Sequence, residues 1–391
     1  MNNPPRILLV DDEPLNIDYL DQELEDKGFE LLSASNGQEA LDVLRESLPD
    51  LVLLDIMMPV MDGFAVLERA KADPATRNIP IIIISANNDL QSVVKGIQCG
   101  AEDYLPKPFE PVILNARISA SLERKRLRDQ EQLYLQSLEN ELNIARAIQT
   151  QFLPSEMPAL PGWEIAPYFK AAKFVAGDYY DAFTLPNGEL VFVVGDVCGK
   201  GVGAALFMTL FRSLLRATAS ASLSLGGEVE GLSPAARLHG AVSITNRYVA
   251  ETHEQALVFS TLVMGVIDGT TGTMTYINAG NEAPYLIRKT GEIEELRPTG
   301  PVIGFDSSAV YKTQETRLEP GDSLLAFTDG IPDAKNPHNE FFGHARLKEV
   351  LNRPAEEPAQ LVAQIGAELD AFIGDAEEQF DDITILALRR V

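Results

Sequence analysis

The sequence has little cysteine and little histidine, and each scarcity excludes a class of protein. Its 391 residues include two cysteines, Cys99 and Cys198, and four histidines. Two thiols that fall in different predicted domains make no disulfide framework, and the scattered histidines lack the spacing of a zinc site. We therefore expect a protein of a reducing compartment, the cytoplasm.

Basic charge is also scarce, because 32 Lys and Arg stand against 58 Asp and Glu, a net charge of −26. Contact with nucleic acid phosphates needs a basic face. The one dense basic cluster, Arg124–Arg128, lies in a charged helical stretch whose side chains ordinarily face solvent. We expect no nucleic acid partner.

Long apolar runs are missing as well. No uninterrupted run approaches the roughly 18 residues that span a bilayer. The amino terminus offers only Ile7–Val10 before the first acids, too little for the apolar core of a signal peptide. We expect neither a membrane span nor a secretory signal.

What the first 110 residues do contain is a set of short apolar runs, each of which stops at a polar residue. Runs of this kind are typical of strands in a parallel sheet that is covered on both faces, and the carboxyl ends of such strands meet at one edge. The runs are Ile7–Val10 before Asp11 and Asp12, Leu51–Leu54 before Asp55, Ile81–Ile84 before Ser85, and Tyr104–Pro106 before Lys107.

The three carboxylates suit Mg²⁺, which binds hard oxygen ligands. The metal and the Lys107 ammonium would offset negative charge while Asp55 attacks phosphorus. This stretch resembles the receiver domain of two-component response regulators over about residues 5–122. The resemblance implies a sensor histidine kinase as partner and a cis bond before Pro108. It also implies Asp55 as phosphoacceptor, Mg²⁺ on Asp11, Asp12, Asp55 and the Met57 carbonyl, Lys107 as phosphate partner, and Ser85 and Tyr104 as the switch pair.

A connector follows, from about Leu114 to Phe152, with neither Gly nor Pro, and its composition predicts one long helix. A heptad pattern along it leaves two interpretations open, a parallel coiled coil that makes a homodimer and a single amphipathic helix on the next domain. The heptad residues are Leu135, Leu138, Leu142, Ala145, Gln149 and Phe152.

Residues 156–391 are expected to form an antiparallel pair of sheets with two helices, Val202–Ala217 and Pro358–Phe372. We expect a loop at Ala219–Ser233. The predicted strands are Leu190–Val194, Leu257–Ile267, Met274–Ile277, Tyr285–Arg288, Ser323–Phe327 and Ile383–Leu388.

Acids recur at the expected strand ends of this region. Asp178 (with Asp181), Asp196 and Asp329 are each expected to follow a strand, and Asp381 and Asp382 open the last one. Carboxylates beside glycines suit a pair of divalent ions that activate water for phosphoryl transfer, and hard oxygen ligands accept Mg²⁺ or Mn²⁺. The alternative is that these acids belong to ordinary hairpin turns and solvated loops.

These motifs resemble the metal-dependent protein phosphatase (PPM) family, in its SpoIIE-like branch, over about residues 160–391. The match extends to Phe259–Thr261, Asn278–Asn281 and Gly300–Gly304, whereas Ala176 stands where the family often has glycine. The resemblance implies two Mn²⁺ or Mg²⁺ ions on Asp178, Asp196, the Val197 carbonyl, Asp329 and Asp381, with Asp181 and Asp382 as further candidates and Asp382 able to replace Asp381.

The predicted protein is multidomain: an α/β doubly wound, flavodoxin-like receiver at 1–122, a helical connector at 123–155, and an α+β phosphatase-type β-sandwich at 156–391. The predicted function is a response regulator, phosphorylated on Asp55, that controls a phosphoserine/phosphothreonine protein phosphatase. Its substrate would be a phosphoprotein such as an anti-sigma factor antagonist. The alternative function is an adaptor whose silent phosphatase-like domain binds a sigma factor or another regulator.

Overall fold

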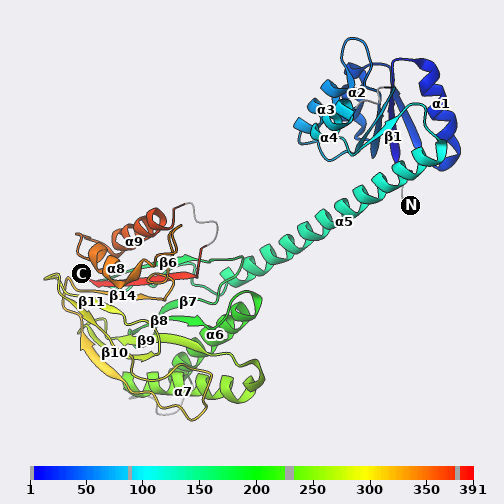
Figure 1. Cartoon of the computed structure of the whole chain (residues 1–391). Coiled ribbons are helices and arrows are strands. Elements are labelled where there is room, and N and C mark those ends of the chain that lie inside the picture. The colour runs from blue at the N-terminus through cyan, green and yellow to red at the C-terminus, as the bar shows by residue number, and fades with distance from the viewer. Residues whose placement is uncertain (1–3, 87–89, 225–232, 375–378) are drawn as a thin grey trace. The chain divides into compact units, whose positions relative to one another are not determined.

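The computed structural model describes residues 4–86, 90–224, 233–374 and 379–391. The chain divides into two compact units, Met1–Leu138 and Glu139–Val391, and each is described here by itself (Figure 1).

The first unit is built on a five-stranded parallel sheet in the order β2-β1-β3-β4-β5. Apolar side chains pack on both faces of the sheet, with Leu8 and Ile83 on one face and Ile7 and Leu53 on the other. This confirms the doubly wound fold that the unalternating apolar runs predict. Its elements are β1 Arg6–Val10, α1 Pro14–Leu24, η1 Glu25–Lys27, β2 Glu30–Ala34, α2 Gly37–Ser47, β3 Leu51–Leu54, α3 Gly63–Ala72, β4 Ile81–Ser85, α4 Leu90–Gln98 and β5 Asp103–Pro106.

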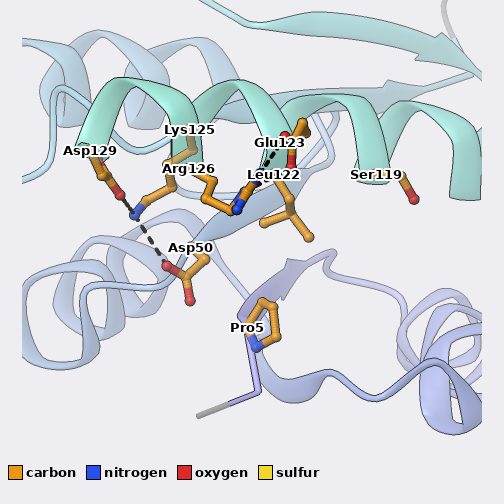
Figure 2. A pocket seen from close by; sticks show the side chains of 8 residues that line it. All are labelled: Pro5, Asp50, Ser119, Leu122, Glu123, Lys125, Arg126 and Asp129. Atoms are coloured by element: carbon orange, nitrogen blue, oxygen red, sulfur yellow. Dashed lines mark hydrogen bonds and ion pairs between the residues drawn. The ribbon is translucent and has the colours of Figure 1, made fainter. Parts of the chain in front are cut away.

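Helix α5 runs without interruption over Pro111–Thr150, as the composition of the connector predicts. Its first turns belong to the core of the first unit, where Leu114 and Ile118 are fully buried. Farther along, the Lys125 ammonium lies 3.2 Å from a carboxylate oxygen of Asp50 and 2.6 Å from one of Asp129 (Figure 2). The pair with Asp50 fastens α5 to the residue before β3, the strand that ends just before Asp55, whereas the pair with Asp129 lies within α5.

The heptad pattern divides between two environments along α5. Leu135 and Leu138 are 57% and 38% exposed, whereas Gln149 is only 8% exposed and packs within the second unit. Pairing of two α5 helices therefore stays a prediction that concerns the first heptads.

The second unit contains two five-stranded antiparallel sheets, ordered β13-β10-β9-β8-β7 and β12-β11-β14-β15-β6. A large apolar core joins the sheets, and α6 and α7 cover the first sheet while α8 and α9 cover the second (Figure 1). The helix–sheet–sheet–helix layers confirm the predicted sandwich. The strands are β6 Trp163–Lys170, β7 Tyr179–Thr184, β8 Leu190–Val197, β9 Ser260–Ile267, β10 Thr273–Ala279, β11 Tyr285–Ile287, β12 Ile293–Glu295, β13 Gln314–Arg317, β14 Ser323–Phe327 and β15 Ile383–Arg390, and the helices are α6 Val202–Ser224, α7 Pro234–Thr252, η2 Glu254–Ala256, α8 Gly343–Leu351 and α9 Pro358–Ile373.

The two helices predicted in this unit are confirmed as α6 and α9, whereas α7 and α8 were missed. In α7 the buried face mixes apolar side chains with Thr245 and Asn246, so its apolar periodicity is weak. The predicted loop was also wrong in part: residues 219–224 continue α6, and Ser233 caps α7 by accepting a hydrogen bond from Ala236 N at 3.3 Å. Residues 225–232 of that loop lie outside the described residues.

Among the described residues, one helix is long and apolar enough, by length and composition alone, to cross a membrane. It is α6, whose window Val202–Ala221 has a mean hydropathy of 1.2. Met208, Phe211 and Leu215 in this helix are fully buried in the core of the second unit. We therefore regard α6 as a core helix of the sandwich.

Candidate functional sites

The edge of the parallel sheet brings together the acids and the lysine that the sequence placed there. One carboxylate oxygen from each of Asp11, Asp12 and Asp55 lies within 4.8 Å of the others. The Lys107 ammonium lies 2.6 Å from Asp11 Oδ2 and 3.1 Å from Asp55 Oδ1. Among the described residues, no other three His, Cys, Asp or Glu side chains bring their ligand atoms so close together. The oxygen donors of this group fit Mg²⁺.

Asp55 is held for reaction from two sides. Its Oδ2 accepts a hydrogen bond from Met57 N at 2.9 Å, while Oδ1 contacts Lys107. Burial raises the pKa of Asp55, and the Lys107 charge works against that rise. Burial alone would lower the pKa of Lys107, but its hydrogen bonds and charge contacts with Asp11 and Asp55 raise it. The lysine therefore stays cationic beside the Asp55 carboxylate.

The remaining receiver residues lie next to this pocket. Ser85 is the last residue of β4 and is fully buried, and its carbonyl accepts a hydrogen bond from Lys107 N at 2.8 Å. Tyr104 lies in β5 and is 6% exposed. The Lys107–Pro108 bond is cis, as the resemblance implies.

In the second unit, Asp178 is buried and held by two threonine hydroxyls. It is 1% exposed, and its Oδ2 accepts hydrogen bonds from the hydroxyls of Thr328 at 2.7 Å and Thr384 at 2.6 Å. Asp178 precedes β7, so the prediction that it follows a strand was wrong. Neither threonine was predicted from the sequence, although each lies within two residues of a predicted acid.

The acids Asp196 and Asp329 interact electrostatically with each other and with Asp381. Burial raises the pKa of Asp196 to about 7, and the charge of Asp329 adds to the rise. Burial and then the charge of Asp381 raise the pKa of Asp329 to about 6. Asp196 also lies within β8 instead of after it. Acids that repel one another in this way fit divalent cations, which would offset their charge.

The last two adjacent acids have different partners. Asp381 contacts the Lys200 ammonium at 3.0 Å. Asp382 accepts backbone hydrogen bonds from Ala172 and Gly177, both at 2.8 Å, so its two oxygens fasten the segment that leads to Asp178. Asp381 is thus the better placed of the pair for a cation.

Asp181 lies apart from these acids. It is fully buried in β7, where Arg212 and Arg216 of α6 contact its carboxylate at 2.9 Å and 2.8 Å. Both oxygens have cationic partners, and their evident effect is to join α6 to the sheet.

Two glycines allow backbone and acids to approach closely. A Cβ at Gly177 would lie 2.8 Å from the Val197 carbonyl oxygen and 3.2 Å from Asp196 Oδ1. A Cβ at Gly330 would overlap the Asp382 carbonyl oxygen. The Gly177 approach brings the Val197 carbonyl beside the Asp178 segment.

The end of α5 is hydrogen-bonded to the segment that carries Asp178. Gln149 donates from Nε2 to Ala176 O at 2.7 Å and accepts from Ala176 N at 3.1 Å. Ala176, the departure from the family's glycine, is fully buried in this position. A two-way amide contact with main chain fixes both the position and the orientation of the residue two before Asp178.

Comparison with protein families matches both units. The model for Stage II sporulation protein E (SpoIIE) matches residues 186–391, and that for the response regulator receiver domain matches residues 7–119. Asp178 lies ahead of the first of these ranges.

Individual proteins match the same regions. Protein IcfG of Synechocystis is 38% identical over 263 residues, which make up 64% of this chain and 41% of that protein. Response regulator PleD of Caulobacter vibrioides is 42% identical over 113 residues, or 29% of this chain and 25% of that protein. The chain thus spans less than half the length of these relatives.

Among solved structures, the SiaA-PP2C domain of Pseudomonas aeruginosa superposes with a TM-score of 0.54 at 26% identity. The match covers 66% of this chain and 98% of that domain.

Proposed function

Since the chain belongs to the SpoIIE family and also carries a response regulator receiver domain, we propose that it is a response regulator whose receiver controls a metal-dependent protein phosphatase. The substrate would be a protein phosphorylated on serine or threonine, for example an anti-sigma factor antagonist. The observation that carries the proposal is the set of mutually repelling acids around Asp196, in which Asp178 is buried, Asp196, Asp329 and Asp381 are half-buried, and the pKa of Asp196 is raised to about 7.

In the phosphatase site, Asp178, Asp196, Asp329 and Asp381, with the Val197 carbonyl, would hold two Mn²⁺ or Mg²⁺ ions. When bound, such ions supply Lewis-acid activation of water and of the phosphoryl group. Thr328 and Thr384 orient Asp178 through their hydroxyls. Asp382 organises the preceding backbone through Ala172 and Gly177. Supporting groups of this kind typically change metal affinity by about 10–100-fold.

In the receiver, the Asp55 carboxylate would attack the phosphorus of a phosphohistidine on a sensor kinase. A P–O bond to Asp55 forms, the P–N bond breaks, and the histidine nitrogen leaves with the electron pair. Asp11, Asp12 and the Met57 carbonyl would complete the Mg²⁺ site, and Lys107 would pair with the phosphoryl oxygens. Ser85 and Tyr104 would then respond as the switch pair.

Coupling between the sites is supported by the contact between Gln149 and Ala176. Any change in α5 that moves Gln149 also moves the main chain beside Asp178, because both hydrogen bonds act on one residue. We further propose that the protein works in the cytoplasm as a homodimer in which exposed heptad residues such as Leu135 pair.

The proposal is tested by hydrolysis of p-nitrophenyl phosphate and of a phosphoserine protein with Mn²⁺ or Mg²⁺. We expect metal-dependent turnover in the unaltered chain and its loss in Asp196→Asn. Asp370→Asn is the matched control, because Asp370 is a carboxylate of the same unit that pairs with Lys170 at 2.8 Å and is not a proposed ligand. Absence of turnover with either metal would reject the phosphatase and favour an adaptor.

A further inference from the structure

Two phenylalanine rings and two lysine ammonium groups gather beside the acids of the second unit. Phe341 and Phe380 are 55% and 42% exposed, and their rings meet edge to face with centroids 6.5 Å apart. Exposed apolar side chains that lie together supply the kind of surface that binds protein partners. We call Lys200, Lys335, Phe341 and Phe380 the cation–aromatic surface.

The ammonium groups lie over the rings. Lys335 Nζ is 3.7 Å from the ring centroid of Phe380 and 4.9 Å from that of Phe341. Lys200 Nζ is 4.8 Å from the centroid of Phe380. In the part of the chain that the structure describes, no ion pair involves Lys335. The two rings hold the Lys335 ammonium in place.

Lys200 connects this surface to the candidate active site. Its ammonium lies 3.0 Å from Asp381 Oδ2 and donates to the Phe380 carbonyl at 2.6 Å. The flanking Gly199 and Gly201 have φ values of +93° and +83°, a conformation that other residues rarely adopt. The tight loop after β8 thus aims one ammonium at the border between the acids and the rings.

The negative charge of the site explains why lysine side chains beside it would help an anionic substrate to approach. The chain carries a net charge of −26, and a phosphorylated substrate is an anion that must approach a cluster of carboxylates. Local positive charge at the edge of such a cluster attracts the phosphate and neighbouring acidic residues. Two ammonium groups beside apolar rings suit a phosphorylated segment whose neighbours include both acidic and apolar side chains.

We propose that the cation–aromatic surface docks the phosphorylated segment of the substrate protein, with Lys200 nearest the phosphate. Lys335 contacts an acidic neighbour of the phosphorylated residue, and Phe341 and Phe380 contact an apolar one. This inference rests on the proposed phosphatase function and names the kind of sequence around the phosphate that the enzyme selects.

The test is fluorescence anisotropy in Mn²⁺ with two labelled nine-residue peptides. Both carry a phosphonate analogue of phosphoserine, which is not hydrolysed, and differ only in flanks of Leu and Glu or of Gly and Ser. We expect the full chain to bind the Leu-Glu peptide about fivefold more tightly or better. Lys335→Glu and Phe341→Ala should each abolish that preference, and Phe341→Tyr, which keeps a ring, should retain it.

Lys348→Ala is the matched control, because Lys348 also lies near an aromatic ring, 5.3 Å from the centroid of Tyr285, and pairs with Glu295 at 2.7 Å. It should keep the preference. Equal binding of the two peptides, or a preference that survives in Lys335→Glu and Phe341→Ala, would overturn the proposal.

Turnover of p-nitrophenyl phosphate by the unaltered chain separates this failure from failure of the proposed function. Metal-dependent turnover together with equal peptide binding removes the docking proposal alone. Absence of turnover removes the phosphatase proposal, and the anisotropy results then decide the docking role by themselves.

Discussion

The carboxylates at the two sites differ in what surrounds their charge. Asp55 has an ammonium in contact, at 3.1 Å. Asp196 and Asp329 have chiefly burial and other acids around them, and their pKa values rise to about 7 and about 6. At the first site the Lys107 ammonium offsets part of the charge of three carboxylates, whereas at the second site repulsion among the acids adds to the rise of their pKa values.

This repulsion predicts a pH dependence of the metal-free protein. Between the ordinary pKa of 3.8 and the raised values, the folded state binds more protons at Asp196 and Asp329 than the unfolded state does. The free energy of unfolding therefore falls as pH rises through this range and is lowest above about pH 7. Urea unfolding of the second unit at pH 5 and pH 8, with and without Mn²⁺, measures it.

Bound Mn²⁺ should remove most of the fall, because the cation takes the place of the protons. Asp196→Asn is the comparison variant and should lessen the fall in metal-free protein. A metal-free stability that rises between pH 5 and pH 8 would contradict this electrostatic account.

At the residue scale, the sequence led to the acids but not to the groups that orient them. Acids at strand ends can be predicted because a strand ends where an apolar run of the sequence ends. Thr328 and Thr384 meet Asp178 across about 150 to 200 residues of chain, a contact set by how two sheets pack. For the same reason the partners of Asp181 on α6 could not be predicted.

Among the elements, strands with a regular apolar pattern were predicted from the sequence, whereas strands with an irregular pattern were missed. Strand β14 has the predicted bounds, Ser323–Phe327. Strand β7 was missed because its sequence, Tyr-Tyr-Asp-Ala-Phe-Thr, places a buried acid among aromatics. The ion pairs of Asp181 with Arg212 and Arg216 of α6 offset the cost of burying its charge. These contacts depend on how α6 packs on the sheet, so the local sequence does not reveal them.

Helix α5 yields a prediction about the contact at its end. Gln149→Ala removes both hydrogen bonds to Ala176, which should loosen the main chain before Asp178. We expect faster amide hydrogen exchange at Ala176 and Gly177, corresponding to a local loss of about 1–3 kcal/mol. Gln151→Ala, an exposed neighbour, is the control. Unchanged exchange in Gln149→Ala would show that other contacts hold this segment.

On the scale of the whole molecule, the proposed control of one unit by the other predicts the effect of removing the phosphoacceptor. Acetyl phosphate should change the rate of phosphoserine peptide hydrolysis by the unaltered chain, and Asp55→Ala should abolish that change. Asp73→Ala is the control, because Asp73 is a receiver carboxylate that pairs with Arg45 instead. Equal responses of Asp55→Ala and the unaltered chain would separate the phosphatase from the receiver.

The order of the domains and both fold classes followed from the sequence, since each domain has its own pattern of strand ends. The environment of the heptad residues could not be predicted from the sequence. Gln149 continues the pattern of Leu135 and Leu138, yet it is buried in its own chain. Periodicity identifies a helix face but not the surface that covers it.

The close approach at Gly330 has a consequence for how this gene can vary. Every single-nucleotide change in a glycine codon that alters the residue introduces a side chain with a Cβ or a stop codon. At position 330 any Cβ would overlap the Asp382 carbonyl oxygen, whereas at Gly203 a Cβ would meet nothing within 4 Å. Every residue change that a single nucleotide step can make at Gly330 therefore forces the main chain at Asp382 to shift.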